Sequence, residues 1–295
     1  MNLKMNFSST YFLFVNIILI ILSIIMITIL KNKKVKNIKD NSINLKYYEK
    51  GYLYKGANFI YNTIIAMILK IYGEGNLEIE QNNYVTKSGE NKKEYILKNV
   101  KKPNLCDAEK KIIGILFSFG NGEISTRTLD KIRRTEPDSY NKKFNDFIYF
   151  MENKMVEKKL FSMEKKTFKM FLAFVIFSLL FFTGTVTVYN ENFWGAISII
   201  FSIICYAFFV TSFSKMTELG NQKFRELEKI EKDLLNYKVN VDDATILAIS
   251  FGLTTENIKK IYENSKESGY EIFFEDDFYK TFKTSFVGDS LLTRN

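Results

Sequence analysis

Residues 170–188 read MFLAFVIFSLLFFTGTVTV and residues 194–213 read WGAISIIFSIICYAFFVTSF, and neither stretch contains a charged side chain. Only YNENF separates them. At about 1.5 Å per residue, a helix of either stretch is long enough to cross the roughly 30 Å hydrocarbon layer of a membrane. Because so short a connection cannot hold a domain, the sequence predicts a transmembrane helical hairpin with residues 189–193 as its loop.

The residue types around this hairpin fit the prediction. Small residues let helices approach closely in a membrane, and the hairpin contains Gly184, Gly195, Ala196 and Ser198. Aromatic residues favour the membrane interface, and the loop region contains Tyr189, Phe193 and Trp194. Glu191 is the only charged residue of the loop.

A third apolar stretch lies near the amino terminus. Residues 10–30 read TYFLFVNIILIILSIIMITIL and are followed directly by KNKKVKNIK at 31–39. A cleaved signal peptide is the alternative, but its apolar region would be shorter and would end in small residues. The sequence therefore predicts an uncleaved membrane helix over 10–30.

The positive charge of the chain predicts its topology. The formal net charge is +9, and lysines gather in two places beside the apolar stretches: within residues 31–39, and at Lys158, Lys159, Lys165, Lys166 and Lys169. Lysine and arginine favour the cytoplasmic side of membrane helices. We therefore expect residues 1–9 and the loop 189–193 outside, and residues 31–169 and 214–295 in the cytoplasm of a multi-pass cell-membrane protein.

Composition argues against several functions. Intramembrane ionisable residues mark many transport pathways, and the three predicted spans contain none, which disfavours a channel or transporter. The chain has no histidine, and its two cysteines, Cys106 and Cys205, lack metal-ligand spacing. The glycine-rich stretches GEG and GNG lack the lysine and spacing of a phosphate-binding loop. We predict no metal, no cofactor and no catalytic residues.

Residues 31–169 are predicted to form an α+β domain. Apolar residues recur with helical spacing over 60–72 and again over 107–119. Short alternating runs at 76–80 and 94–99 predict two strands joined by a long exposed hairpin loop at 81–93. Two further helices follow, over 127–134 and 141–161. Helices combined with a β-hairpin predict a winged-helix-like domain.

Four basic side chains in this domain are candidate contacts for phosphate or for anionic lipid: Arg127, Lys131, Arg133 and Arg134. Such a cluster is compatible with DNA phosphates. However, Asp130, Glu136 and Asp138 interrupt it. We therefore favour a solvated helix beside acidic headgroups, and we do not expect nucleic acid as a partner.

Residues 214–295 are predicted to form a helical segment that packs on residues 31–169. TELGNQKFRELEKIEKDLLN at 217–236 is an amphipathic helix whose apolar face needs a cover. Asp242 or Asp243 is expected to cap a helix that Gly252 ends, and Thr254 or Thr255 to cap the next. YEIFFEDDFYKTF at 270–282 is either a last helix or an interfacial segment. Its acidic residues, Glu275, Asp276 and Asp277, could bind a cation, although a solvated charge run is the simpler interpretation.

The order of several short motifs resembles the YciQ-like family of predicted membrane proteins, a domain family of unknown function. The motifs before the hairpin are Tyr47-Tyr48, Gly51-Tyr52-Leu53 and Gly75-Asn76-Leu77-Glu78-Ile79. Those after it are Thr217 with Gly220, and the run from Ala244 through Leu253. The resemblance covers roughly residues 45–255 and implies an architecture without catalytic residues. The sequence departs from the family pattern in two ways. Glu49 stands where a proline is usual, and only nine residues precede the first span, where a large β-rich outer domain is usual.

Three functions follow as hypotheses. The first is a non-enzymatic membrane protein whose cytoplasmic module, a scaffold, binds an unknown cytoplasmic or membrane protein partner. The alternative is a membrane-tethered winged-helix DNA-binding regulator that uses the basic cluster. The third is an enzyme that uses carboxylates such as Asp242 and Asp243, but these two residues are equally suited to cap a helix.

Overall fold

The computed structural model describes residues 6–31, 43–86, 88–99, 105–190, 192–212, 216–275 and 277–288, and it is mainly helical with one small sheet. The chain divides into two compact units. The bundle unit comprises Met1–Lys39 and Lys159–Gln222, and the sheet unit comprises Asp40–Lys158 and Lys223–Asn295. Most of the first lysine cluster, Glu191 and Asp276 lie outside the described residues.

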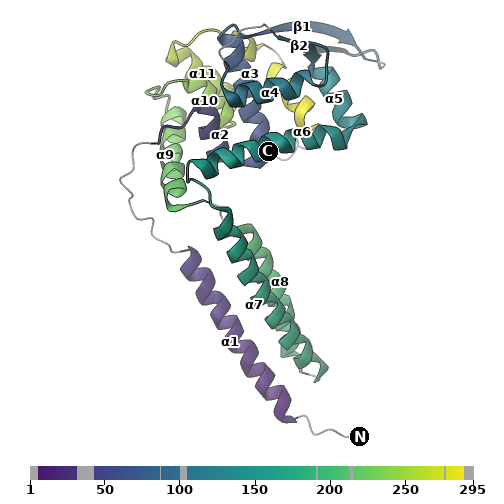
Figure 1. The fold of residues 1–295 in the computed structure, drawn as a ribbon, viewed down its shortest axis with the longest axis vertical. Helices are drawn as coiled ribbons and strands as arrows, with labels where there is room; N and C mark the ends of the chain where they lie inside the picture. Colours follow the sequence, from purple (N-terminus) through teal and green to yellow (C-terminus); the bar gives the residue numbers. More distant parts are fainter. Residues whose placement is uncertain are drawn as a thin grey trace. The chain divides into compact units, whose positions relative to one another are not determined.

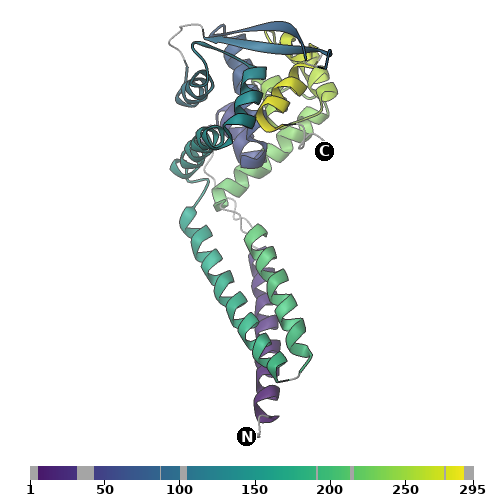
Figure 2. The ribbon, with the colours of Figure 1, turned by 90° about the vertical axis from the view of Figure 1, so that its right-hand side faces the viewer.

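The bundle unit contains three long helices, α1 (Asn6–Lys31), α7 (Met163–Tyr189) and α8 (Trp194–Ser212), which lie side by side in Figures 1 and 2. Within the described part of the chain, only Phe171–Tyr189 of α7, with mean hydropathy 2.3, is long and apolar enough to cross a membrane. Phe14–Ile25 and Trp194–Ile204 are shorter apolar stretches. The predicted helical hairpin is present, because α7 and α8 pack against each other, but only its first arm meets the criterion for a membrane span. Helix α7 begins at Met163, before the predicted span.

Two features hold the helices of the bundle unit together. A Cβ atom added to Gly195 would lie 2.5 Å from the Gly184 carbonyl oxygen, so α7 and α8 touch through their backbones, as the small residues predicted. In addition, the buried amide of Asn16 in α1 donates to Thr187 Oγ1 at 3.1 Å and accepts from Thr183 Oγ1 in α7. These polar contacts fix the register of α1 against α7, and the apolar pattern of the sequence did not reveal them.

The segment that follows α6 (Pro137–Glu157) pairs with the segment that precedes α9 (Glu218–Leu235). Thr217 N donates to the Leu160 carbonyl at 2.9 Å, and Thr217 Oγ1 donates to the Lys159 carbonyl at 2.6 Å. The same hydroxyl oxygen accepts from Gly220 N at 3.0 Å. A Cβ atom on Gly220 would lie 2.2 Å from the Leu160 carbonyl oxygen. The Thr-x-x-Gly motif is thus both a helix cap and a point of close backbone contact.

The first part of the sheet unit contains α2 (Tyr47–Lys55), a short 3₁₀ turn η1 (Ala57–Phe59), α3 (Ile60–Gly73), α4 (Asp107–Phe117), α5 (Thr126–Thr135) and α6 (Pro137–Glu157). Helix α3 lies in the middle of the unit (Figures 1 and 2), and its side chains from Ile64 to Leu69 are at most 1% exposed. Helix α2 was not predicted, because it is buried on more than one side and shows no apolar periodicity.

A three-stranded antiparallel sheet in the order β1-β2-β3 covers one side of this core. The strands are β1 (Leu77–Val85), β2 (Asn91–Asn99) and β3 (Glu123–Ser125). Ile79, Leu97 and Ile124 face one another across the ladder and are all buried. These three side chains lie on the face of the sheet that packs on the core, while the other face meets water. This arrangement explains why sequences that alternate apolar and polar residues form the strands.

The prediction of a long hairpin loop at 81–93 is wrong. Strand β1 continues to Val85 and β2 starts at Asn91, so the connection is a short turn. Thr86 N donates to the Glu90 carbonyl at 2.8 Å, and Gly89 adopts a positive φ of 85°. Beyond the core both faces of the hairpin are solvated, so its strands carry polar residues without alternation while the backbone ladder continues.

The second part of the sheet unit packs on the first. It contains most of α9, then α10 (Ala244–Ser250), α11 (Thr255–Ser265), a 3₁₀ turn η2 (Glu271–Phe274) and α12 (Phe278–Val287). The ring of Phe224 in α9 lies 5.2 Å from that of Tyr54 in α2. The aromatic tail forms a last helix, because Phe278 of α12 is fully buried with its ring 4.8 Å from that of Tyr95 in β2.

Candidate functional site

The four basic residues predicted as phosphate or lipid contacts lie on α5, but they do not form one cluster. Arg127 is exposed, and its guanidinium lies 4.4 Å from the centre of the Tyr84 ring. Arg133 and Arg134 both pair with Asp130, the former at 2.6 Å. Lys131 is exposed on the same helix. The carboxylate of Asp130 therefore forms ion pairs with two of the four cations.

A groove of about 660 Å³ lies between the β-hairpin, α5 and α12. Arg127 and Arg134 line it, whereas Lys131 and Arg133 do not. Lys92 from β2 and Lys280 from α12 also line it, and sequence reasoning missed both. No local pattern could have found them, because the three elements are distant in the sequence. We call this the basic groove.

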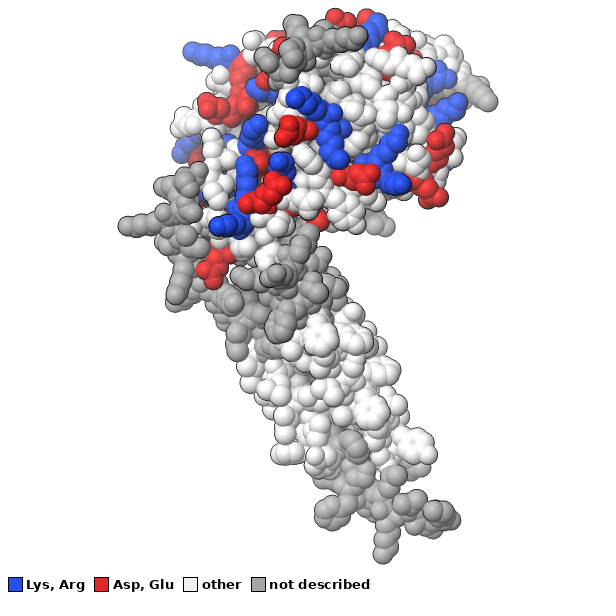
Figure 3. Space-filling model, in the orientation of Figure 1, with Lys and Arg blue, Asp and Glu red and all other residues white. Residues whose placement is uncertain are grey.

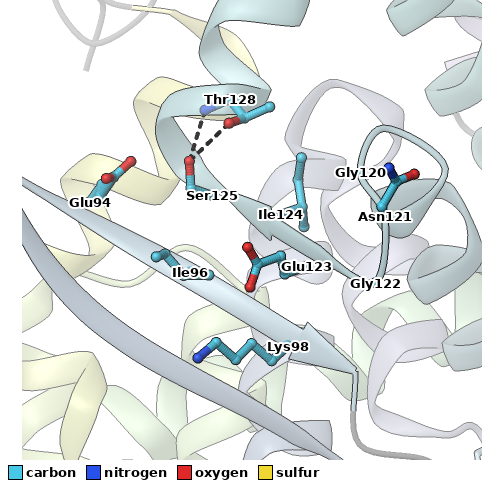
Figure 4. A pocket seen from close by; sticks show the side chains of 10 residues that line it. All are labelled: Glu94, Ile96, Lys98, Gly120, Asn121, Gly122, Glu123, Ile124, Ser125 and Thr128. Carbon is cyan, nitrogen blue, oxygen red and sulfur yellow. Dashed lines mark hydrogen bonds between the residues drawn. The ribbon is translucent and has the colours of Figure 1, made fainter.

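A second hollow, of about 620 Å³, lies over the outer face of the sheet beside β3 (Figure 4). Glu94, Ile96 and Lys98 reach it from β2, and Glu123 reaches it from β3. Lys98 is paired with Glu80. The Ser125 hydroxyl accepts from Thr128 N at 3.1 Å and so caps α5. Since these polar groups already serve the fold, this hollow is the weaker candidate for a ligand site.

The prediction that an aspartate side chain caps α10 is wrong. Asp243 occupies the N-cap position, but its side chain makes no capping hydrogen bond and instead accepts from Lys70 Nζ at 2.6 Å. The Glu267 carboxylate takes the capping role, because it accepts from Ala244 N at 2.7 Å and from Thr245 N at 3.1 Å. Gly252 ends α10 with φ 69°, and Thr254 caps α11, both as predicted.

We expect Glu267→Ala to lower the free energy of unfolding of the sheet unit by about 1 kcal/mol, because two amides at the start of α10 lose their acceptor. Asp242→Ala is the matched control, since Asp242 is exposed, and we expect a change within about 0.5 kcal/mol. Urea unfolding of both variants measures the difference. An equal loss in the two variants would contradict the assignment of Glu267 as the cap.

The described residues of the acidic triplet, Glu275 and Asp277, do not belong to a cation site. Glu275 is exposed, and Asp277 precedes α12 with a positive φ of 67° and lines the basic groove. In the ranges that the structure covers, no three His, Cys, Asp or Glu side chains come close enough to share a metal ion.

A buried polar cluster surrounds the residues of the family motif. Tyr47 donates to Glu109 Oε1 at 2.8 Å, and Cys106 N donates to Glu109 Oε2 at 2.8 Å. Burial, together with the negative charge of Glu109, raises the pKa of Tyr47 well above its ordinary value, so the phenol remains a donor. Burial also raises the pKa of the Cys106 thiol, which disfavours the reactive thiolate. The cluster therefore has a structural role.

Glu49 is also part of this structure. Its carboxylate is 3% exposed, accepts from Lys46 N at 2.8 Å and pairs with Lys158 Nζ at 2.6 Å. It therefore caps α2 and joins the start of α2 to the residue that follows α6.

The fold defines a mainly helical protein with a small antiparallel sheet and an apolar helical bundle. The family model described as the C-terminal domain of predicted membrane proteins (DUF2207) matches residues 49–245, and the chain belongs to this family. The matched region includes the Gly51, Gly75 and Thr217 motifs and ends in α10. No curated protein and no solved structure matches the chain.

Proposed function

We propose that this protein crosses the membrane three times and presents the sheet unit to the cytoplasm, where the unit binds a protein partner without catalysis. One observation carries the topology. Residues before α7 and after α8 share a single core, as the contact of Tyr95 with Phe278 shows. Both parts must therefore lie in one compartment, which supports a hairpin in which α7 crosses the membrane and α8 returns.

The surface of the bundle unit supports three membrane helices. Large apolar side chains are exposed on each helix, including Phe14 at 64%, Phe182 at 64% and Ile204 at 59%. In Figure 3 the described surface of the bundle is free of charged residues on the face shown, whereas the sheet unit carries both signs. Exposed apolar surface of this extent needs a lipid or protein cover, and the lysine bias of the sequence favours the cytoplasm for the sheet unit.

Labelling of single cysteines tests this topology. In a Cys106→Ser, Cys205→Ser background, we expect Tyr189→Cys to react with an impermeant maleimide on intact cells, because Tyr189 is 82% exposed at the end of α7. Ser88→Cys and Lys259→Cys, both exposed in the sheet unit, should react only after permeabilisation. Labelling of the last two positions from opposite sides would refute the shared compartment.

The outer edge of β1 supports a protein partner. Among the described strands, β1 pairs only with β2, and its residues from Glu80 to Asn83 are exposed. An unpaired strand edge offers backbone donors and acceptors to an extended segment of another protein. We therefore propose that the partner adds a strand to β1.

Photo-crosslinking in cells tests this surface. A photoreactive amino acid at Gln81 on β1 should give an adduct with one protein, whereas the same group at Lys260 on α11, which is also exposed, should not. Recovery of lipid adducts alone at Gln81 would count against a protein partner. A proline at Asn83 should reduce the adduct, because proline removes a backbone donor.

A winged-helix DNA-binding regulator remains the second candidate, and the basic groove is the observation in its favour. The pairing of Arg133 and Arg134 with Asp130 weakens it, because phosphates would have to compete with that carboxylate. We expect the purified full chain to show no shift of duplex DNA at low ionic strength. A shift that Arg127→Ala abolishes would support the regulator instead.

A further inference from the structure

The basic groove brings together cations from three elements. Its cationic lining residues are Lys92, Lys93, Arg127, Arg134 and Lys280, and its anionic ones are Asp130 and Asp277. Five positive and two negative side chains leave a net charge of +3. Asp130 is engaged by Arg133 and Arg134 within α5. Lys92 also pairs with Glu90, at 3.5 Å. The positive charge that lines the groove therefore comes from the hairpin, from α5 and from α12.

Arg127 is held in position at the wall of this groove. Its guanidinium carbon lies 4.4 Å from the centre of the Tyr84 ring, at the distance of a cation–π contact. A stacked guanidinium keeps its N–H groups available at the edge of the plane, where they match two oxygens of one phosphate. The contact with Tyr84 therefore holds the guanidinium of Arg127 in position in the absence of a ligand.

The shape of the groove distinguishes among anionic ligands. A volume of about 660 Å³ is in the range of small-molecule sites. A flat bilayer cannot enter a concave groove, and a duplex would need phosphate contacts along α5, where Asp130 interrupts the cations. Tyr84 adds an aromatic wall beside the cations, which suits a planar ring carried by the same ligand.

We infer that the basic groove binds a soluble phosphorylated small molecule, with its phosphate between Arg127, Lys280 and Lys92 and an attached ring near Tyr84. The groove borders the β1 edge, because Asn83 belongs to both, but the inferred ligand does not depend on the proposed partner. A nucleoside diphosphate has both chemical features and is a suitable probe.

Fluorescence anisotropy of an N-methylanthraniloyl nucleoside diphosphate tests the inference. The full chain is placed in nanodiscs of zwitterionic phosphatidylcholine. We expect saturable binding that pyrophosphate displaces and that adenosine displaces only weakly. Arg127→Ala combined with Lys280→Ala should weaken binding by about tenfold or more, because charged hydrogen bonds are lost. Arg127→Lys should weaken binding less, since lysine keeps the positive charge but lacks the planar guanidinium that can donate to two phosphate oxygens.

Lys131→Ala is the matched control, because Lys131 has the same charge and lies exposed on α5 but does not line the groove. Its affinity should stay within about twofold of the unmodified chain. Equal weakening by Lys131→Ala would overturn the inference, because net charge alone would then explain binding. It would also be overturned by the absence of saturable binding, or by binding only in nanodiscs that contain anionic lipid.

Discussion

Phe278→Ala is expected to lower the free energy of unfolding of the sheet unit by about 3–5 kcal/mol, the usual cost of deleting a buried phenylalanine. The side chain is fully buried, with ring centres 4.8 Å from Tyr95 and 4.5 Å from Phe282. Its loss leaves a cavity where α12 meets the sheet. Urea unfolding of the full chain, followed through the near-ultraviolet circular dichroism of its tyrosines, measures the change.

Tyr149→Ala is the control for this substitution. Tyr149 is 64% exposed on α6, so removal of an equally large aromatic ring there should change the free energy of unfolding by no more than about 0.5 kcal/mol. If Phe278→Ala were as mild as this control, α12 would not be part of the core. The single compartment inferred for residues 43–158 and 223–288 would then lose its main support.

Gly220→Ala is expected to open the contact between Thr217 and Leu160. The added methyl group would lie 2.2 Å from a backbone oxygen, which cannot rotate away as a side chain can. We expect a cost of about 1–3 kcal/mol from this overpacking, despite a gain of about 1 kcal/mol in helix propensity. Hydrogen exchange measured by mass spectrometry should show reduced protection of the Thr217 and Gly220 amides.

Gly114→Ala is the matched control for this substitution. Gly114 lies within α4, and an added Cβ atom meets nothing within 4 Å. There the propensity gain of up to about 1 kcal/mol should appear without a steric cost. If Gly220→Ala stabilised the chain as Gly114→Ala does, close backbone contact would not explain the glycine of the Thr-x-x-Gly motif.

The candidate site was only partly predictable. Arg127 and Arg134 stand out locally as a basic run on a helix, and both line the basic groove. Lys92 and Lys280 have no local signal, since a lysine on a strand or a terminal helix is ordinarily a solvated charge. Asp243 was expected to cap α10, but its partner is Lys70, which no spacing rule connects with it.

The sequence by itself determined the apolar helices, the helical hairpin with small residues for close packing, and most helices of the sheet unit. These depend on hydrophobicity and periodicity over short distances, which a single segment displays without its neighbours. Only the tertiary structure decided the short turn of the β-hairpin, the burial of α2, the Glu267 cap and the assembly of the basic groove. Each of these depends on backbone pairing or on side chains brought together from distant segments, and such contacts leave no periodic trace in the chain.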